Sequence, residues 1–365
     1  MKRTGILVLV FFFCSVLTVF PQAQSQTKTH IITFDPPGSV GTYPVSISDT
    51  GAITGQWFDA NGVSHGFVRD PDGTISTWDV TVPGTVGCQG CEINARGEIA
   101  GCFWDANNTS TGYRRTTDGK ITPIVVPGSG TGPNQGSMAM ALNDAGWILG
   151  QDTISDTLQY SLLVAPDGKQ ITFNPAGTTW SWGGMESAIN PAGAIIGGYV
   201  DSNEVYHGYV RAPNGKITTL DAPSWGQGAG EGTFPSGISP NGTIVGFVQD
   251  NNELTHGFVR TPGGRFMTFD VPGAGTVQGS WEGTFAMDIN AAGTITGYIA
   301  DANWVAHGFL QAWDGRTMVF DGPNASTAQY QGTFPITVNA EGVITGYYFD
   351  SNGVSHGFVG LPPRR

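Results

Sequence analysis

Charged side chains are scarce in this sequence: Asp, Glu, Lys and Arg make up only 12% of its 365 residues. Acidic residues outnumber basic ones by 29 to 16, which gives a formal net charge of −13. The sequence has no basic cluster that would offset this acidic excess. It also has no Gly-rich loop of the kind that binds phosphate. A surface of this sign repels the phosphates of nucleic acids and anionic membrane surfaces. We therefore expect no nucleic-acid partner and no membrane partner for the mature chain.

Long apolar runs are absent except near the N-terminus, where residues 5–20 follow Lys2 and Arg3. This run is shorter than the roughly 20 residues that a transmembrane helix needs. A basic start, an apolar stretch and a polar region are typical of a secretory signal peptide. We predict a signal peptide over residues 1–25, with a retained anchor as the alternative. The mature chain is then expected to be secreted, extracellular or periplasmic.

Helical periodicity is also missing, whereas glycine (55 residues) and proline (22 residues) are abundant. The motif Gly-x-Ile-x-Gly recurs instead at intervals of 46 to 51 residues. Its opening glycines are Gly51, Gly97, Gly146, Gly193, Gly242, Gly293 and Gly342. A near-constant period of this size indicates an array of one supersecondary unit. Apolar and small residues alternate within the motif with the period of two that is typical of a strand.

Each copy of the repeat is interpreted as four short strands separated by turns. Asp-x-Asn-Gly and Pro-x-Gly turns separate the Gly-x-Ile strand from a His-Gly-Phe strand, and that strand from a fourth one ending in Asp. The copies begin near residues 40, 86, 135, 182, 231, 282 and 331. We predict an all-β chain with one domain over residues 27–365. Its expected architecture is a seven-bladed β-propeller with four antiparallel strands in each blade.

The turn chemistry also predicts cross-strand partners. If residues 70–73 form a type I turn with a glycine bulge, then His65 faces Asp79 on the next strand. Two copies lack both the His and the Asp, as expected of partners joined by a hydrogen bond. We predict structural pairs at His65–Asp79, His207–Asp221, His256–Asp270, His307–Asp321 and His356–Asp35.

The final pair follows from the chain ends. The last copy stops after its third strand, at His356, whereas a matching fourth strand at residues 29–35 precedes the first copy. We predict that this N-terminal strand completes the last blade and closes the ring, because an open array would need atypical capping repeats.

Cysteines are few, and after loss of Cys14 only Cys88, Cys91 and Cys102 remain. Three cysteines in an oxidising compartment allow at most one internal disulfide. Cys102 lies across the predicted hairpin from Cys91 or Cys88, and either could be its partner. We predict a local disulfide, with Cys91–Cys102 as the possible pair. A zinc site would need a fourth ligand that the neighbouring sequence does not supply. We predict no metal and no cofactor.

The segments that link one copy to the next vary most, and such loops on a rigid scaffold commonly carry function. They are rich in aromatic residues and should gather on one face of the ring. Each linker ends in a glycine, and the residues just before these glycines are expected to form a ring of side chains. One arc of that ring is acidic and polar. The predicted ligand-binding residues are Trp182, Trp225, Glu231, Trp281, Glu282, Tyr330 and Gln331.

The repeat resembles the bacterial extracellular HAF repeat, whose hallmark is His-Ala-Phe after a Gly-rich strand. The tripeptide here is His-Gly-Phe at His65, His256, His307 and His356, and His-Gly-Tyr at His207. The resemblance covers residues 27–365 and departs from the family at the middle position. It implies export and a repeat fold, and it supplies no catalytic residues.

We expect a monomeric binding module rather than an enzyme. Exposed tryptophan beside carboxylates and amides suits a carbohydrate or cell-envelope ligand, because a flat ring covers the apolar face of a sugar. One alternative is a glycoside hydrolase or lyase that uses Glu231 and Glu282 as acid and base. The other is a protein-docking scaffold without a small ligand.

Overall fold

The computed structural model describes residues 30–178, 180–182, 189–223 and 225–362. The predicted signal peptide lies outside this range. The described part of the chain contains no helix, and therefore none that is long and apolar enough to cross a membrane. It consists of short antiparallel strands that repeat in groups of four, in agreement with the all-β prediction.

The first group shows the pattern: β2 (Gly41–Ile47) pairs with β3 (Ile53–Phe58), β3 with β4 (Ser64–Arg69), and β4 with β5 (Ile75–Trp78). The other complete groups, in chain order, are β6 (Thr85–Ile93), β7 (Ile99–Asp105), β8 (Ser110–Arg115), β9 (Ile121–Ile124); β10 (Gly136–Leu142), β11 (Ile148–Ser155), β12 (Leu158–Val164), β13 (Gln170–Phe173); β14 (Ser181–Trp182), β15 (Ile195–Val200), β16 (Tyr206–Arg211), β17 (Ile217–Leu220); β18 (Thr233–Ile238), β19 (Ile244–Gln249), β20 (Thr255–Arg260), β21 (Phe266–Phe269); and β22 (Gly283–Ile289), β23 (Ile295–Ala300), β24 (Ala306–Gln311), β25 (Thr317–Phe320).

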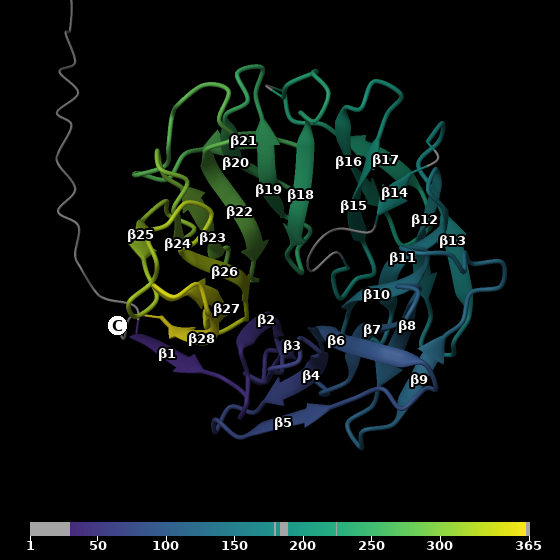
Figure 1. Cartoon of the computed structure of the whole chain (residues 1–365). Coiled ribbons are helices and arrows are strands. Elements are labelled where there is room, and N and C mark those ends of the chain that lie inside the picture. The colour runs from purple at the N-terminus through teal and green to yellow at the C-terminus, as the bar shows by residue number, and fades with distance from the viewer. Residues whose placement is uncertain (1–29, 179, 183–188, 224, 363–365) are drawn as a thin grey trace, which may run out of the picture.

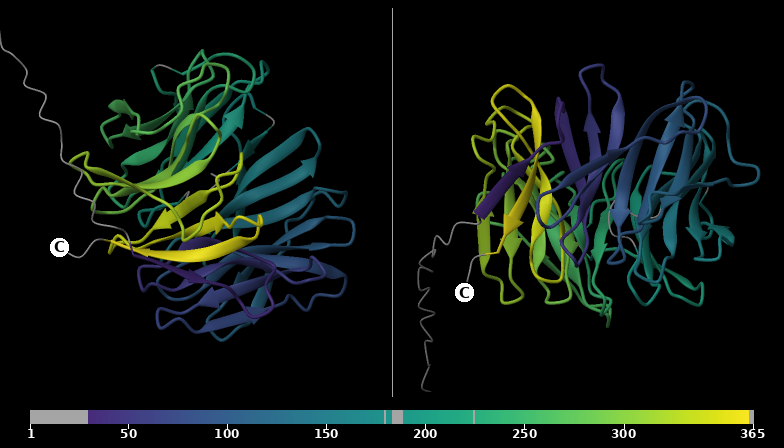
Figure 2. Two further views of the ribbon diagram at one scale, coloured as in Figure 1. Left: turned by 60° about the vertical axis from the view of Figure 1, so that its left-hand side comes forward. Right: turned by 90° about the horizontal axis from the view of Figure 1, so that it is seen from below.

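The remaining strands join the two ends of the chain. They are β26 (Thr333–Val338), β27 (Ile344–Phe349), β28 (Ser355–Leu361) and β1 (His30–Phe34), and β1 pairs antiparallel with β28. Figures 1 and 2 show these first and last strands side by side. No single sheet runs round the molecule: the strands form three sheets of four and two of eight, in which one parallel bridge joins neighbouring groups.

The groups are arranged around a common centre, with the fourth strand of each at the periphery and, in all groups except that of β14, the first strand nearest the centre (Figure 1). Local chemistry explains the strands. Gly242 has a φ of +85° and donates its N–H to the Ser239 carbonyl. This bond closes the tight turn that leads into β19. Gly246 allows close pairing, because a Cβ there would lie 2.2 Å from the Phe234 carbonyl oxygen.

The core consists of the apolar residues of the repeat. The isoleucine of the Gly-x-Ile strand and the ring of the His-Gly-Phe strand are buried, and Ile53, Ile344, Phe67 and Phe358 have no exposed surface. Burial of a side chain of this size contributes about 1.5–3 kcal/mol. In four groups the glycine before the ring leaves room for an aromatic side chain of the fourth strand; a Cβ on Gly66, for example, would collide with Trp78.

A bulge near the end of most first strands changes the direction of one residue. The pairing register shifts in this way between Gly90 and Glu92 and between Ala286 and Asp288. Such bulges turn side chains out of the alternation of the strand. Glu92 consequently accepts a hydrogen bond from Ser46 of the preceding group, and Asp288 accepts one from the Val338 N–H of the following group.

Candidate binding face

The linkers lie against the turns between second and third strands, and backbone hydrogen bonds fix both. Tyr330 N donates to the Trp304 carbonyl at 2.8 Å, and Trp281 N donates to the Glu253 carbonyl at 3.0 Å. Gly230 and Glu204 form the same bond in the preceding group. Three successive linkers are thus anchored to their neighbouring turns by the same backbone bond.

Two large aromatic residues occupy linker positions that favour glycine. Trp281 and Tyr330 have φ angles of 56° and 64°, and the residue at the same position of the preceding linker is Gly230, with a φ of +86°. Trp304, in the turn beside Tyr330, also has a positive φ, of 61°. The left-handed conformation costs a residue with a Cβ about 1–2 kcal/mol. Strain of this kind is concentrated at functional sites.

We use the name aromatic platform for three rings that lie on two successive linkers and on the turn beside the second of them: Trp281, Trp304 and Tyr330. The ring centroids of Trp304 and Tyr330 lie 5.3 Å apart. Trp281 is 40% exposed and Tyr330 is 64% exposed. The Trp281 ring extends toward Gly230 of the neighbouring linker, since a Cβ on that glycine would lie 3.6 Å from it. Exposed ring surface is therefore present on two successive linkers, as Trp281 on one and as the Trp304–Tyr330 pair on the next.

The two glutamates proposed as an acid–base pair are engaged in their own loops. Glu231 Oε2 accepts the Gly228 N–H at 2.6 Å, and Glu282 Oε2 accepts the Val277 N–H at 3.1 Å. Both residues are buried, with exposures of 8% and 2%. Gln135 caps its own linker in the same way by accepting the Gly132 N–H. We therefore interpret this ring position as a loop cap, and the structure does not bring these carboxylates together at the surface.

The other predicted ligand-binding residues have mixed environments. Trp225 is partly buried and packs edge-on against His207, with centroids 5.0 Å apart. Gln331 is partly buried, and its carbonyl accepts the Ala306 N–H that anchors the linker. Trp182 forms the end of β14, and its side chain lies outside the described part of the structure. Sequence reasoning missed Trp304, because its turn matched the ordinary hairpin pattern of the repeat.

All five predicted His–Asp pairs are hydrogen-bonded through Nδ1 of the imidazole. The distances are 2.6 Å for His65–Asp79, 3.2 Å for His207–Asp221, 2.7 Å for His256–Asp270, 2.8 Å for His307–Asp321 and 2.8 Å for His356–Asp35. Each imidazole also has its Nε2 3.7–3.8 Å from a second aspartate, in the turn before the third strand. Every histidine of the repeat thus lies between two carboxylates.

The three cysteines of the second group correct one prediction. Cys88, Cys91 and Cys102 are free and buried, so the predicted Cys91–Cys102 disulfide is not formed. Cys102 lies directly opposite Gln89 and Cys91 lies at a bulge, yet the thiols of Cys91 and Cys102 are hydrogen-bonded to each other. The Gln89 amide donates to both sulfurs, at 3.2 and 3.3 Å. Burial raises the pKa of the Cys88 thiol to about 11, which makes it unreactive.

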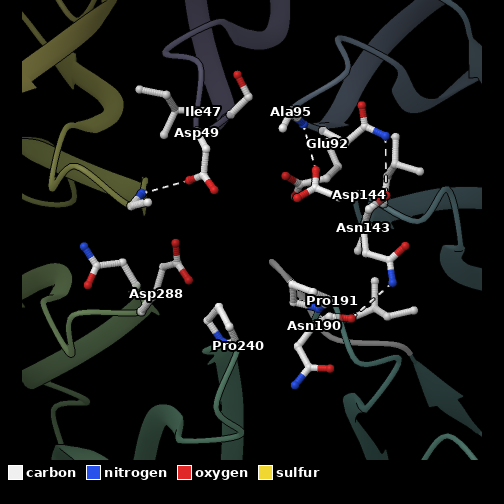
Figure 3. Close-up of a pocket in the computed structure, with 18 of the residues that line it drawn as sticks. Ile47, Asp49, Glu92, Ala95, Asn143, Asp144, Asn190, Pro191, Pro240 and Asp288 are labelled. Carbon is white, nitrogen blue, oxygen red and sulfur yellow. Dashed lines mark hydrogen bonds between the residues drawn. The ribbon is translucent and has the colours of Figure 1, made fainter.

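A cavity of about 180 Å³ lies at the other end of the first strands, where turns from around the whole structure converge (Figure 3). Four carboxylates line it: Asp49, Glu92, Asp144 and Asp288. Asp49 accepts the Ala340 N–H and Asp144 accepts the Ala95 N–H, so these two join neighbouring turns. Burial raises the pKa of Glu92 to about 8 and that of Asp288 to about 6.

A ladder of asparagine side chains surrounds the same cavity. Asn94 donates to the Asn143 carbonyl, Asn143 to that of Asn190, and Asn190 to that of Ser239. Asn290 and Asn339 continue the pattern on the other side. Among the described residues, no group of three or more His, Cys, Asp or Glu side chains is arranged to hold a metal ion. We interpret this end of the molecule as a structural girdle.

Comparison with known proteins places the fold. No family model and no curated protein matches the sequence. Among solved structures, virginiamycin B lyase from Staphylococcus aureus is similar, with a TM-score of 0.58 and 14% identity over 92% of this chain and all of the lyase. An ancestral GH74 enzyme gives a TM-score of 0.54 at 13% identity, over 91% of this chain and 49% of the enzyme. A puromycin hydrolase gives 0.51 at 11% identity, over 91% of this chain and 57% of the hydrolase. At these identities the similarity concerns the fold alone, and that fold is β-propeller-like.

Proposed function

We propose that this chain is an exported β-propeller binding module that recognises a carbohydrate or cell-envelope ligand on its aromatic platform. The observation that carries the proposal is the conformation of Trp281 and Tyr330. Each is bulky, exposed and held at a positive φ, although glycine at the equivalent Gly230 forms the same backbone hydrogen bond. A purely structural linker has no need of an exposed ring there.

The chemistry of the platform favours a sugar ligand. Tryptophan and tyrosine rings cover the apolar face of a pyranose, while nearby polar groups bind its hydroxyls. Glu253 is exposed and could supply such a polar group, because its backbone carbonyl accepts the Trp281 N–H. Association through exposed rings also needs no acid–base pair, which is consistent with the engagement of Glu231 and Glu282 in their own loops.

The proposed architecture is a ring of seven blades closed by the N-terminal strand. Two contacts support it: β1 pairs with β28, and the Asn339 amide donates to the Ser48 carbonyl. Closure of this kind leaves only short, protected strand edges. Export through a signal peptide at residues 1–25 belongs to the same proposal, as does membership of an HAF-like repeat family.

A glycan array tests this function. Wild type, Trp281→Gly and Tyr330→Gly are compared on bacterial envelope and plant polysaccharides, with Trp313→Ala as the matched control. Trp313 is 81% exposed but lies in a different turn, between β24 and β25. We expect wild type and Trp313→Ala to retain the same glycans and both glycine variants to lose them. Retention of no glycan by any variant would favour the protein-docking alternative instead.

A further inference from the structure

The His–Asp pairs beside the aromatic platform are connected to it through one continuous path. Asp301 lies in the turn between β23 and β24, 3.7 Å from His307 Nε2. Its Oδ1 accepts the N–H groups of Asn303 and Val305, at 2.8 and 2.9 Å, and so shapes the turn that contains Trp304. The Trp304 carbonyl then accepts the Tyr330 N–H. His307 is thus linked to the platform in three steps.

The preceding group repeats this path for the other exposed ring. Asp250 lies 3.7 Å from His256 Nε2, and its Oδ1 accepts the Asn252 and Leu254 N–H groups. The Glu253 carbonyl of that turn accepts the Trp281 N–H at 3.0 Å. The positive φ of Glu253, Trp281, Trp304 and Tyr330 makes both turns and both linkers dependent on these bonds.

The charge of the imidazole decides how it acts on the turn. A neutral imidazole that donates from Nδ1 to Asp321 turns the lone pair of Nε2 toward the Asp301 carboxylate, which is unfavourable. A protonated imidazole has an N–H on both sides and attracts both carboxylates. The residues that face the two histidines across the sheet are Ile299 and Val248, which do not titrate.

The electrostatics have the sign that this account requires. The hydrogen bond to Asp321 raises the pKa of His307 and outweighs its burial, and Asp270 does the same for His256. Burial alone would raise the pKa of Asp301, but the N–H groups of its turn outweigh it and lower that pKa. A raised histidine pKa in the folded state means stabilisation that is complete below about pH 6.5 and is lost as the pH rises through the folded value.

We propose that protonation of His256 and His307 locks the turns that hold the aromatic platform, so that the ligand binds more tightly in mildly acidic than in alkaline solution. The part of this inference that concerns the ligand rests on the proposed function. The locking of the turns does not, and it can be measured on the protein alone. Coupling between two sites at the lower end of the usual range changes affinity about five-fold, and we expect an effect of that size here.

Amide hydrogen exchange at pH 5.5 and pH 8, corrected for the intrinsic pH dependence of exchange, tests the locking. We expect the Trp281 and Tyr330 amides to be several-fold more protected at pH 5.5. His307→Gln should abolish this difference at Tyr330 and leave it at Trp281, and His256→Gln should do the reverse. His65→Gln is the matched control and should change neither, because its turn carries no platform residue. Protection that does not depend on pH in wild type would overturn the proposal.

Binding of a glycan retained on the array, at the same two pH values, completes the test. We expect about five-fold tighter binding at pH 5.5 for wild type and for His65→Gln, and no difference for the double variant His256→Gln/His307→Gln. If the amides respond to pH but no glycan is retained, the proposed function fails and the lock stands. If a glycan binds equally at both pH values, the function stands and the coupling is refuted.

Discussion

Asn339 donates its side-chain amide to the backbone carbonyl of Ser48, 291 residues earlier, at 3.2 Å. The same side chain accepts the N–H groups of Glu341 and Val343 through its Oδ1 and thereby shapes its own turn. Ser48 and Ser239 are at the equivalent positions of their groups, where serine hydroxyls shape the turn. One asparagine therefore joins the first and last groups of the chain as well as capping a turn.

Substitutions at Asn339 can separate its two contributions to the free energy of unfolding, the bond to Ser48 and the shaping of its own turn. Asn339→Ser should keep the turn and lose the bond to Ser48, which lowers the free energy of unfolding by about 1 kcal/mol. Asn339→Ala should lose both and cost roughly twice as much. Chemical denaturation measures the two values. Equal stability of Asn339→Ser and wild type would show that the bond across the chain ends contributes nothing.

The N-terminal strand should be as important as any internal one. Phe34 is 8% exposed and packs edge-on against Phe67 of the first group, with centroids 5.8 Å apart. Phe34→Ala should cost about 3 kcal/mol, as expected for a buried aromatic side chain. Ile32 on the same strand is 37% exposed, and Ile32→Ala should cost less than about 1 kcal/mol. Similar costs for the two variants would argue that β1 is not packed on the body of the protein.

A rise in pH from about 4.5 to about 8 should destabilise the part of the protein that surrounds the cavity. The folded pKa of Glu92 is about 8 against an ordinary value of 4.5, so between these pH values the folded state holds a proton that the unfolded chain has released. Stability therefore falls as the pH rises through this window. Glu92→Gln keeps an acceptor for Ser46 and removes the charge. We expect the free energy of unfolding of Glu92→Gln to exceed that of wild type by about 1–3 kcal/mol at pH 8. At pH 4 the two values should be nearly equal.

The pairing within each repeat was predictable from sequence because turns fix register. Counting from the turn at residues 70–73 placed His65 opposite Asp79, and the missing last strand pointed to residues 29–35. Both deductions use only the period of a strand and the size of a turn. The same regularity does not predict the bulge at Cys91 or the state of the cysteines: Cys91 and Cys102 lie in contact as free thiols, not as the predicted disulfide.

The candidate site was less predictable because the linkers do not repeat. Glu231 and Glu282 stood out as a matched pair of carboxylates, yet each closes hydrogen bonds inside its own loop. Their direction depends on the path of the linker, which has no period to count. The strain at Trp281 and Tyr330 had one sequence signal, the alignment of both residues with Gly230. Trp304 becomes informative only when its contact with Tyr330 is known.

The strained rings give the most direct test of the account as a whole. In Tyr330→Gly, relief of about 1–2 kcal/mol of steric cost offsets the roughly 0.5–1 kcal/mol of extra chain entropy that glycine loses on folding. The free energy of unfolding of this variant should therefore stay within about 1 kcal/mol of wild type.

Stability and glycan binding of Tyr330→Gly, measured on the same preparation, decide whether the ring serves a ligand or the scaffold. We predict unchanged stability with at least a ten-fold loss of affinity for the retained glycan. A variant that binds as wild type does, or that loses roughly 3 kcal/mol or more of stability, would show that Tyr330 supports the fold and would contradict the proposed binding platform.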